Sequence, residues 1–306
     1  MSKWTFRNIP SQRGRSAVVT GTGGLGLETA LALARAGADV VIAGRNPDKG
    51  AKAVEAIRET APAAQVRFSK VDLANLGSIA QFAAQFGQEQ DSIDLLVNNA
   101  GVMRTPERRE TSDGFELQLG TNCHFALTAH LLPLLKRGQK PRVVTVGSVA
   151  ARWGAINFDD LQAERGYKPM QVYSQSKLAC IIFAFELNRR SEAAGWGVAS
   201  LAAHPGISRT DLIPNGPGWS SLPGFARRPA WQGALPTLFA ATDPAARSGL
   251  YYGPDRLAGT RGYPTLEKAP SQALDVAVAV RLWETSMELT HVDMDAGRPQ
   301  ALIAPT

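Results

Sequence analysis

Short apolar runs alternate with longer segments whose apolar residues recur at helical spacing along most of the chain. The short runs predict buried β-strands at residues 17–20, 39–43, 65–71, 93–97, 142–146 and 197–203. The periodic segments predict helices at residues 28–36, 49–60, 76–86 and 115–135, around Tyr173 to Lys177, and at about 271–290. This alternation predicts an α/β fold, a single-domain doubly wound parallel sheet with helices on both faces.

The composition is compatible with one large domain. The chain has 306 residues, of which 44% are hydrophobic, so it can bury a large core. It contains no internal repeat, and we predict one domain over residues 1–306. Residues 211–229 are rich in Gly, Pro, Ser and Trp, which indicates a long surface loop rather than a linker, because regular structure resumes at Ala230.

Charge and cysteine content exclude several classes of protein. The formal net charge is +6, but the basic residues are scattered and have no interleaved aromatic residues, so we predict no nucleic-acid partner. No apolar run approaches the roughly 20 residues that span a bilayer, and residues 1–11 lack a signal-peptide core, so we expect a cytoplasmic protein without a membrane span. Cys123 and Cys180 have no metal-site spacing, so we expect two reduced core thiols and no metal.

A glycine-rich turn follows the first predicted strand. It consists of Gly21, Thr22, Gly23, Gly24, Leu25 and Gly26. Glycine lets the backbone turn sharply and approach a pyrophosphate closely, and the following helix presents free N–H groups to the anion. The second strand follows at the distance of a βαβ unit, which favours dinucleotide binding in a Rossmann fold over a flexible surface turn.

The end of the second strand bears on the choice of dinucleotide. A protein that prefers NAD usually has a carboxylate there, which accepts a hydrogen bond from the ribose 2′-hydroxyl. This chain has Gly44, Arg45 and Asn46 instead, and an arginine can pair bidentately with a 2′-phosphate. The sequence therefore predicts NADP, the alternative being an arginine that faces solvent.

One pair of residues on a predicted helix suggests acid–base chemistry. Tyr173 and Lys177 are four residues apart, so both side chains lie on the same helical face. The ammonium would favour the phenolate, which makes Tyr173 a candidate proton donor and acceptor. Such a pair is common by chance, but here it follows Ser148 and a polar segment, residues 98–101, at two other strand ends.

Together these motifs resemble the short-chain dehydrogenase/reductase family from about Arg13 to Leu289. The resemblance rests on the glycine turn, Asp72, the Asn98-Asn99-Ala100-Gly101 segment, Asn122, Ser148, the Tyr173 and Lys177 pair, His204-Pro205-Gly206 and Thr210. Within the family, the segments around Asn157 and Tyr173 look like the branch of retinol dehydrogenases, WW-domain oxidoreductase and protochlorophyllide reductases. Two segments are shorter than in the family, the glycine turn by one residue and the link from Asn122 to His124 and Phe125 by two.

The resemblance implies a catalytic tetrad. Ser148 would bind the substrate oxygen, Tyr173 would transfer the proton, Lys177 would bind the nicotinamide ribose, and Asn122 would position a water that relays protons. It also implies that the dinucleotide contacts the glycine turn, Arg45 and Asn46, together with Asp72, Leu73, Asn99, Ala100, Gly101, Tyr173, Lys177, Pro205, Gly206 and Thr210. In the family the His204 triplet is a turn beside the nicotinamide, so we expect His204 to be structural.

The predicted function is NADP-dependent interconversion of a ketone or aldehyde and its alcohol. Apolar residues in 150–172 and in the predicted substrate loop, residues 211–229, suggest a bulky hydrophobic small-molecule substrate, although both segments could cover the protein's own core or a subunit contact in a homo-oligomer. A non-catalytic NADP(H) sensor or scaffold is an alternative from another class, and a protochlorophyllide-type reductase is an alternative enzyme.

Overall fold

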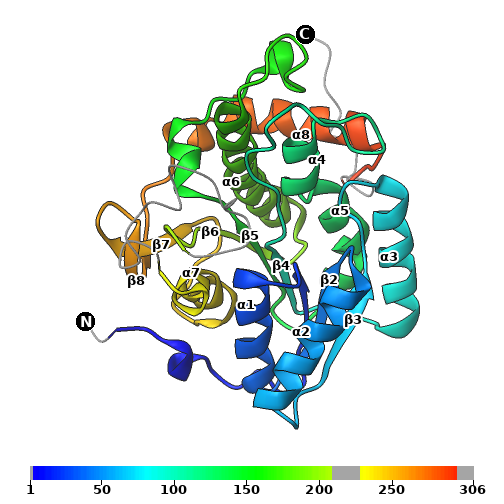
Figure 1. Cartoon of the computed structure of the whole chain (residues 1–306), viewed down its shortest axis with the longest axis vertical. Helices are drawn as coiled ribbons and strands as arrows, with labels where there is room; N and C mark the ends of the chain where they lie inside the picture. The colour runs from blue at the N-terminus through cyan, green and yellow to red at the C-terminus, as the bar shows by residue number, and fades with distance from the viewer. Residues whose placement is uncertain (1–2, 209–227, 295–306) are drawn as a thin grey trace.

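All strands of the described chain form one sheet. The computed structural model describes residues 3–208 and 228–294. The strand order is β3-β2-β1-β4-β5-β6-β7-β8, in which β1 to β7 are parallel and β8 pairs antiparallel with β7 (Figure 1). The strands are β1 (Ser16–Thr20), β2 (Asp39–Gly44), β3 (Val66–Lys70), β4 (Leu95–Asn98), β5 (Arg142–Val146), β6 (Ala199–Ala203), β7 (Tyr251–Arg256) and β8 (Arg261–Leu266).

Helices cover both faces of this sheet, which confirms the predicted fold class. α1, α2 and α7 lie on one face and α3, α5 and α6 on the other, while α4 and α8 pack against α6. The helices are α1 (Gly24–Arg35), α2 (Pro47–Thr60), α3 (Leu76–Glu89), α4 (Leu117–Asn122), α5 (Phe125–Leu135), α6 (Pro169–Ala194), α7 (Ala230–Thr242) and α8 (Val276–Thr290). Short 3₁₀ helices are η1 (Phe6–Asn8), η2 (Val149–Trp153), η3 (Phe158–Asp160) and η5 (Ser271–Leu274).

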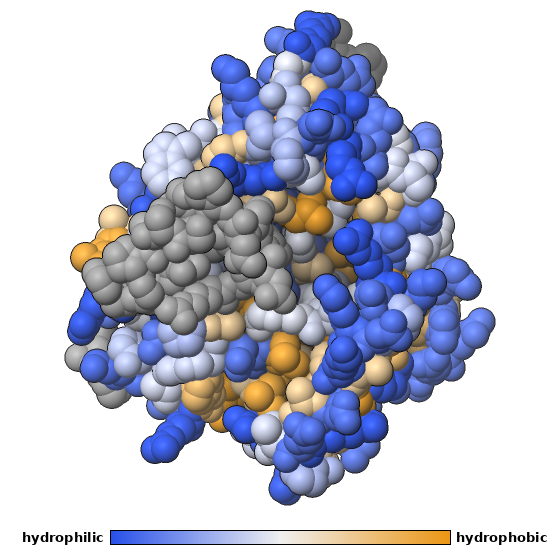
Figure 2. Space-filling view, viewed as in Figure 1, coloured by the Kyte–Doolittle hydropathy of each residue, from blue (hydrophilic) through white to orange (hydrophobic). Residues whose placement is uncertain are grey.

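The central strands are apolar on both faces because helices cover both. Along β1, Val19 packs in the cluster beneath α1 and α7, whereas its neighbour Val18 packs in the cluster beneath α3 and α5. Successive side chains of a strand point to opposite faces, so a strand buried on both must be apolar throughout. Its partners β2 and β4 are apolar for the same reason. Figure 2 shows hydrophilic residues over much of the outer surface in one view.

The predicted single helix over residues 115–135 is wrong. α4 ends at Asn122, α5 begins at Phe125, and His124 between them adopts the left-handed conformation with φ of 52°. That conformation is uncommon outside glycine and interrupts a right-handed helix. Neither Gly nor Pro occurs at positions 123 and 124, and the apolar periodicity continues on both sides, so the sequence pattern does not predict that the helix ends there.

The C-terminal third contains strands that hydrophobic patterning misses. β7 contains Gly253 and Pro254 and β8 contains Gly262 and Pro264, residues that usually argue against a strand. β8 forms the edge of the sheet, and the pairing of β7 with β6 ends at Tyr252, so Gly253 and Pro254 lie where lost ladder hydrogen bonds cost less. The predicted helix at 271–290 consists of η5 followed by α8, whose first turn is capped by the Asp275 carboxylate.

An aromatic cluster anchors α8 to the domain. The Trp283 ring centroid lies 5.1 Å from that of Phe125 and 5.9 Å from that of Phe183, and the Arg190 guanidinium lies 4.6 Å from it. Trp283 is 2% exposed. No helix in residues 3–208 and 228–294 has the length and apolar character that a membrane crossing requires.

Replacing Trp283 should strongly destabilise the protein. Trp283→Ala removes a buried ring that α5, α6 and α8 share, so we expect the free energy of unfolding to fall by about 3–5 kcal/mol in chemical denaturation. The matched control is Trp153→Ala, because Trp153 is 72% exposed and its loss should change stability by less than about 0.5 kcal/mol. Equal effects of the two variants would contradict the role of the cluster.

Candidate active site

The glycine turn joins β1 to α1 in the middle of the sheet. Gly21 has φ of +102°, and a Cβ on Gly26 would lie 2.4 Å from the Gly21 carbonyl oxygen and 2.7 Å from Asn99 Nδ2. Neither position therefore admits a side chain. The Asn99 amide nitrogen donates to the Thr20 carbonyl oxygen at 2.7 Å, which ties the polar segment after β4 to the turn.

The glycine turn presents a row of N–H groups that have no acceptor among the described residues. The backbone N–H groups of Thr22, Gly23, Gly24 and Leu25 donate to no acceptor within the described chain, whereas those of Gly26 and Leu27 bond to the Gly23 carbonyl oxygen. α1 begins at Gly24, so its positive dipole end lies at the same place. Successive free donors at a helix N-terminus form an anion site.

The ends of β2 and β3 place further predicted residues at this edge of the sheet. Arg45 is exposed and has no hydrogen bond or ion pair with any described residue. Asn46 caps α2, since its side-chain oxygen accepts from the Lys49 backbone N–H at 3.0 Å. The Asp72 carboxylate accepts from the Ala74 N–H at 3.0 Å, and Leu73 beside it is buried.

Helix α6 holds Tyr173 and Lys177 in a buried position. The helix starts with Pro169 in its first turn and ends at Gly195 in the left-handed conformation, as sequence rules for helix ends favour. Tyr173 is 6% and Lys177 4% exposed. The Lys177 ammonium donates to the Val146 carbonyl oxygen at the end of β5, 3.0 Å away, while the Tyr173 hydroxyl has no hydrogen-bond partner among the described residues.

Ser148 follows β5 and caps η2. Its hydroxyl oxygen accepts from the Ala150 N–H at 3.2 Å, so the hydroxyl proton remains available. η2 packs against α6, and the Tyr251 hydroxyl lies 3.5 Å from the Ser148 carbonyl oxygen. Burial raises the pKa of Tyr251, which therefore stays neutral beside the site.

Three hydrogen bonds hold the side-chain amide of Asn122 at the end of α4. Its side-chain nitrogen donates to the Val102 carbonyl oxygen at 3.0 Å and to Ser176 Oγ at 2.9 Å, and its side-chain oxygen accepts from the Val102 N–H at 2.8 Å. A Cβ on Gly101 would lie 2.6 Å from Asn122 Oδ1 and 3.5 Å from Lys177 Nζ. Gly101, Asn122 and Lys177 thus converge despite their separation in sequence.

The His204 triplet forms the predicted turn after β6. His204 is fully buried, its ring lies 5.0 Å from that of Tyr251, and Nδ1 accepts from the Gly206 N–H at 3.3 Å. Burial lowers the pKa of His204. Arg228, which the sequence analysis did not single out, donates to the Pro205 carbonyl oxygen at 3.4 Å. Thr210 and the predicted loop as far as residue 227 lie outside the described residues.

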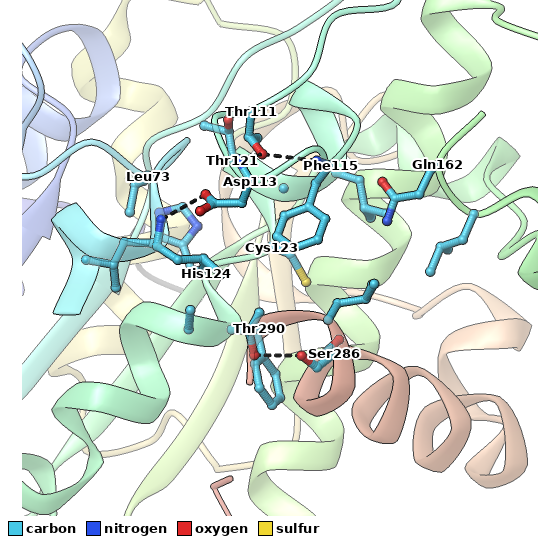
Figure 3. Close-up of a pocket in the computed structure, with 18 of the residues that line it drawn as sticks. Leu73, Thr111, Asp113, Phe115, Thr121, Cys123, His124, Gln162, Ser286 and Thr290 are labelled. Atoms are coloured by element: carbon cyan, nitrogen blue, oxygen red, sulfur yellow. Dashed lines mark hydrogen bonds between the residues drawn. The ribbon is translucent and has the colours of Figure 1, made fainter. Parts of the chain in front are cut away.

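The two cysteines differ in their surroundings. Cys180 is fully buried on α6, and its thiol lies 3.2 Å from the Asn122 carbonyl oxygen. Cys123 lines a cavity between α3, α4 and α8 (Figure 3). Burial raises the pKa of both thiols, so neither is a reactive thiolate. At about 60 Å³ the cavity is too small for a bulky substrate.

Several apolar residues proposed for the substrate pocket belong to the fold instead. Ile156 is buried in a core cluster that includes residues of α6 and α8, and the Phe158 ring lies 4.1 Å below the Arg281 guanidinium. The Tyr167 hydroxyl donates to the Thr105 carbonyl oxygen at 3.0 Å. Trp153 is exposed, so the structure explains only part of the segment's apolar character.

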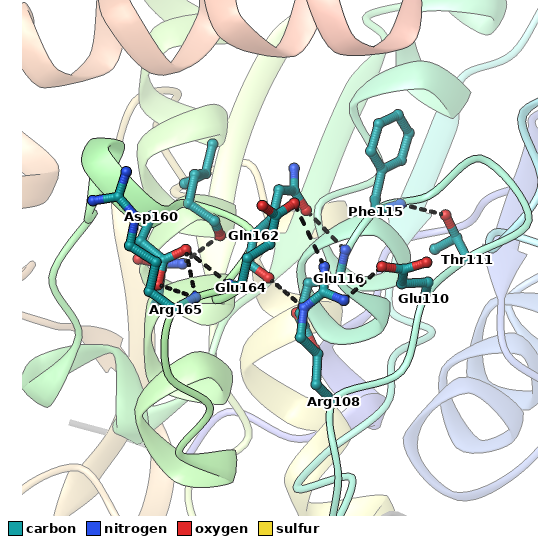
Figure 4. A network of polar contacts seen from close by, with 11 residues as sticks. Arg108, Glu110, Thr111, Phe115, Glu116, Asp160, Gln162, Glu164 and Arg165 are labelled. Atoms are coloured by element: carbon teal, nitrogen blue, oxygen red, sulfur yellow. Dashed lines mark hydrogen bonds and ion pairs between the residues drawn. The ribbon is translucent and has the colours of Figure 1, made fainter.

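Polar contacts join this segment to the one before α4. Arg108 donates to the Gln162 carbonyl oxygen at 2.9 Å and pairs with Glu110 at 2.5 Å (Figure 4). The Gln162 side chain accepts from the Glu116 N–H at 2.8 Å. These bonds fix two loops from distant parts of the chain relative to α4.

Comparison with known proteins shows the class of protein. The family model described as short chain dehydrogenase matches residues 15–217, and the chain belongs to the short-chain dehydrogenase family. It is therefore an oxidoreductase, and the resemblance to the retinol dehydrogenase branch is confirmed.

Individual relatives cover nearly the whole chain. Retinol dehydrogenase 13 of Mus musculus is 38% identical over 94% of this chain and 86% of its own length. Polyprenol dehydrogenase of Mus musculus is 38% identical over 92% and 85%. The crystal structure of an uncharacterized protein from Mycobacterium Paratuberculosis has a TM-score of 0.81 and 39% identity, and covers 96% of this chain and 99% of that one.

The buried His124 should make stability depend on pH. Burial, with Lys177 nearby, lowers the pKa of His124 from 6.5 to about 4. Between these two values the unfolded chain binds more protons than the folded one, so the free energy of unfolding falls as pH drops from 6.5 to 4, by ~3 kcal/mol from this group. Asparagine does not titrate, so His124→Asn should show a shallower loss over this range in urea denaturation. Parallel pH profiles for the two proteins would contradict this.

Proposed function

We propose that the protein is an NADP-dependent oxidoreductase that interconverts a bulky apolar alcohol and its aldehyde or ketone. The observation that carries this proposal is the convergence of Lys177, Asn122 and Gly101 at the edge of the sheet where the glycine turn presents its unpaired N–H groups. Tyr173 lies on the same helical face as Lys177, and its hydroxyl has no other described partner. A proton donor beside an anion-binding turn is the arrangement that hydride-transfer chemistry requires.

The residues present fit a dinucleotide. The four free N–H groups at the start of α1 would hold the pyrophosphate. Gly21 and Gly26 carry no side chain that would keep the pyrophosphate away from the backbone. The unpaired guanidinium of Arg45 is available to a 2′-phosphate, and no carboxylate stands at the end of β2 to repel one. When bound, the nicotinamide supplies or accepts the hydride.

The side chains of this chain would handle the proton and the substrate oxygen. In the reducing direction, Ser148 would donate a hydrogen bond to the carbonyl oxygen with the proton that its own cap interaction leaves free. Tyr173 would transfer its phenolic proton to that oxygen as negative charge develops there. The Lys177 ammonium, held by the Val146 carbonyl, would stabilise the resulting phenolate. Asn122 would position a water from which Lys177 and Tyr173 recover a proton.

Relatives support an apolar substrate. Two relatives of 38% identity are named for the oxidation of retinol and of polyprenol, both largely apolar alcohols. In this chain the exposed Trp153 follows the serine that would bind the substrate oxygen. Assay of the purified protein with NADPH and NADH, against aldehydes and ketones that include retinal, tests the proposed activity. A lack of turnover with every carbonyl would overturn it.

Tyr173→Phe should nearly abolish turnover and leave cofactor binding almost unchanged. The variant removes only the transferable proton, and general acid catalysis contributes about 10²- to 10⁴-fold to the rate. Steady-state kinetics give kcat, and NADPH fluorescence titration gives the cofactor affinity. Activity above a tenth of wild type would assign the proton donor to another group.

Arg45→Asp should move the cofactor preference from NADP toward NAD. The change removes a phosphate partner and places a carboxylate where the ribose hydroxyls would lie. The ratio of kcat/KM for the two cofactors measures the effect. Arg35→Asp is the matched control, because Arg35 lies in the last turn of α1, away from the carboxyl ends of the strands where the cofactor would bind. A ratio that does not respond to Arg45→Asp would mean that Arg45 faces solvent.

Catalytic efficiency should rise as apolar groups are added to the carbonyl substrate. Each buried methylene contributes about 0.8 kcal/mol, so kcat/KM should increase about fourfold per methylene until the pocket is filled. A homologous series of aliphatic aldehydes measures the trend. If efficiency declines steadily with chain length, the apolar pocket does not exist, whereas the oxidoreductase chemistry would remain.

A further inference from the structure

A network of hydrogen bonds joins the segment after β4 to the helix that carries Tyr173, by way of His124 and Asn122. The Ala100 N–H donates to Thr20 Oγ1 at 2.9 Å, and Thr20 Oγ1 lies 3.0 Å from His124 Nε2. His124 Nδ1 lies 2.8 Å from the Asn122 carbonyl oxygen. The network continues through Asn122 itself, whose side-chain nitrogen donates to Ser176 Oγ. Ser176 Oγ in turn donates to the Tyr173 carbonyl oxygen at 2.8 Å.

The partners determine where the protons lie. A carbonyl oxygen can only accept, so His124 Nδ1 must carry the proton that it shares with Asn122. Thr20 Oγ1 already accepts from the Asn99 and Ala100 N–H groups, both at 2.9 Å. Both lone pairs of Oγ1 are thus used, so His124 Nε2 cannot donate to it and must be the unprotonated nitrogen. The Thr20 proton has two acceptors in reach, Nε2 at 3.0 Å and the Val97 carbonyl oxygen at 3.3 Å, and Nε2 is the nearer.

Burial favours the same neutral imidazole. His124 is 3% exposed and Thr20 is fully buried. Burial and the Lys177 ammonium both lower the pKa of His124, to about 4, so the ring carries no charge at neutral pH. A protonated ring would also direct a second N–H toward a hydroxyl that has no lone pair left to accept it.

We propose that His124 is a positioning residue that sets the relative placement of the glycine turn and of the Asn122 and Lys177 side of the site. This inference rests on the proposed function and deepens it. The neutral ring accepts from Thr20 at the end of β1 and donates to Asn122 at the end of α4, and so spans two elements with one rigid group. The left-handed backbone at His124 places the ring between them and ends α4 at Asn122.

Few other side chains could make this connection. A hydroxyl is too short to reach both partners. An aliphatic residue would leave the Thr20 proton only the longer bond to the Val97 carbonyl oxygen, at 3.3 Å, and would remove one donor to the Asn122 carbonyl. Asparagine tolerates the left-handed conformation and can place an N–H where His124 has Nδ1, but it has no atom in the position of Nε2. His124→Asn therefore breaks the link to Thr20 and keeps the other contact.

The tautomer can be measured without cofactor or turnover. Nitrogen-15 NMR of histidine-labelled wild-type protein at pH 7 should show one of its four histidines with a protonated, slowly exchanging Nδ1 and an unprotonated Nε2. His124→Asn should remove that signal, and His130→Asn, on the same helix as Phe125, should leave it. A His124 ring that is protonated at Nε2 or at both nitrogens would overturn the proposal.

A double-mutant cycle tests the coupling to the cofactor site. His124→Asn should weaken NADPH affinity about tenfold in fluorescence titration, the value of one hydrogen bond. Thr20→Val should weaken it at least as much, because it also removes the acceptor of the Asn99 and Ala100 N–H groups. The double variant should lose about as much affinity as Thr20→Val alone, rather than the product of the two single losses, because both changes break the link between Thr20 and His124. Thr20→Ser keeps the hydroxyl and should recover most of the affinity that Thr20→Val loses.

His130→Asn is the matched control for the cycle, since His130 is half-buried on α5 and has no described hydrogen bond. Additive losses in the double variant would overturn the proposal, as would lower stability with unchanged cofactor affinity, which marks a merely structural histidine. If wild-type protein binds NADPH but reduces no carbonyl, the proposed function fails while this coupling still stands or falls on its own measurements.

Discussion

Parallel pairing of β1 with both β2 and β4 is the constraint on which the rest of the site depends. The chain moves outward from β1 to β2 and β3, then returns to place β4 on the other side of β1. The connections on the two sides therefore diverge from the strand ends and leave a crevice above β1 and β4, the usual ligand position in such sheets. Asn99, which follows β4, donates two hydrogen bonds to Thr20 at the end of β1, one from its backbone N–H and one from its side chain.

The crevice brings an anion site and a cation together. Free N–H groups at the start of α1 lie on one side, and Lys177 on α6 on the other. A lysine buried to this degree requires a compensating partner, and within the described chain it donates to a backbone carbonyl rather than to a carboxylate. An anionic ligand in the crevice would complete the electrostatic environment of this ammonium.

The link between α4 and α5 combines backbone strain with a polar network. Instead of extending one helix, the chain breaks it at His124 in a left-handed conformation that costs free energy outside glycine. The break is offset by two hydrogen bonds of the buried ring, to Thr20 and to the Asn122 backbone. Local strain and a polar network thus occur at the same residue, next to the candidate catalytic groups.

Local sequence patterns are enough to predict the order of strands and helices up to β6, apart from the break between α4 and α5, as well as the glycine turn and the Tyr173 and Lys177 pair. These features follow from local rules: apolar runs for strands buried on both faces, glycine where the backbone turns, and four-residue spacing on one helical face. The family could be recognised for the same reason, because its motifs lie at strand ends that periodicity locates.

Tertiary contacts, by contrast, decide the break at His124, the strands β7 and β8, and the surroundings of Ile156 and Phe158. In its left-handed conformation, His124 places its ring against two partners, Thr20 and the Asn122 carbonyl oxygen, and the sequence pattern indicates neither contact. β7 and β8 tolerate Gly and Pro because β8 lies at the edge of the sheet and Gly253 and Pro254 of β7 lie beyond the residues that pair with β6. The apolar side chains of Ile156 and Phe158 cover the domain's own helices, since burial depends on neighbours from other parts of the chain, which a local pattern does not contain.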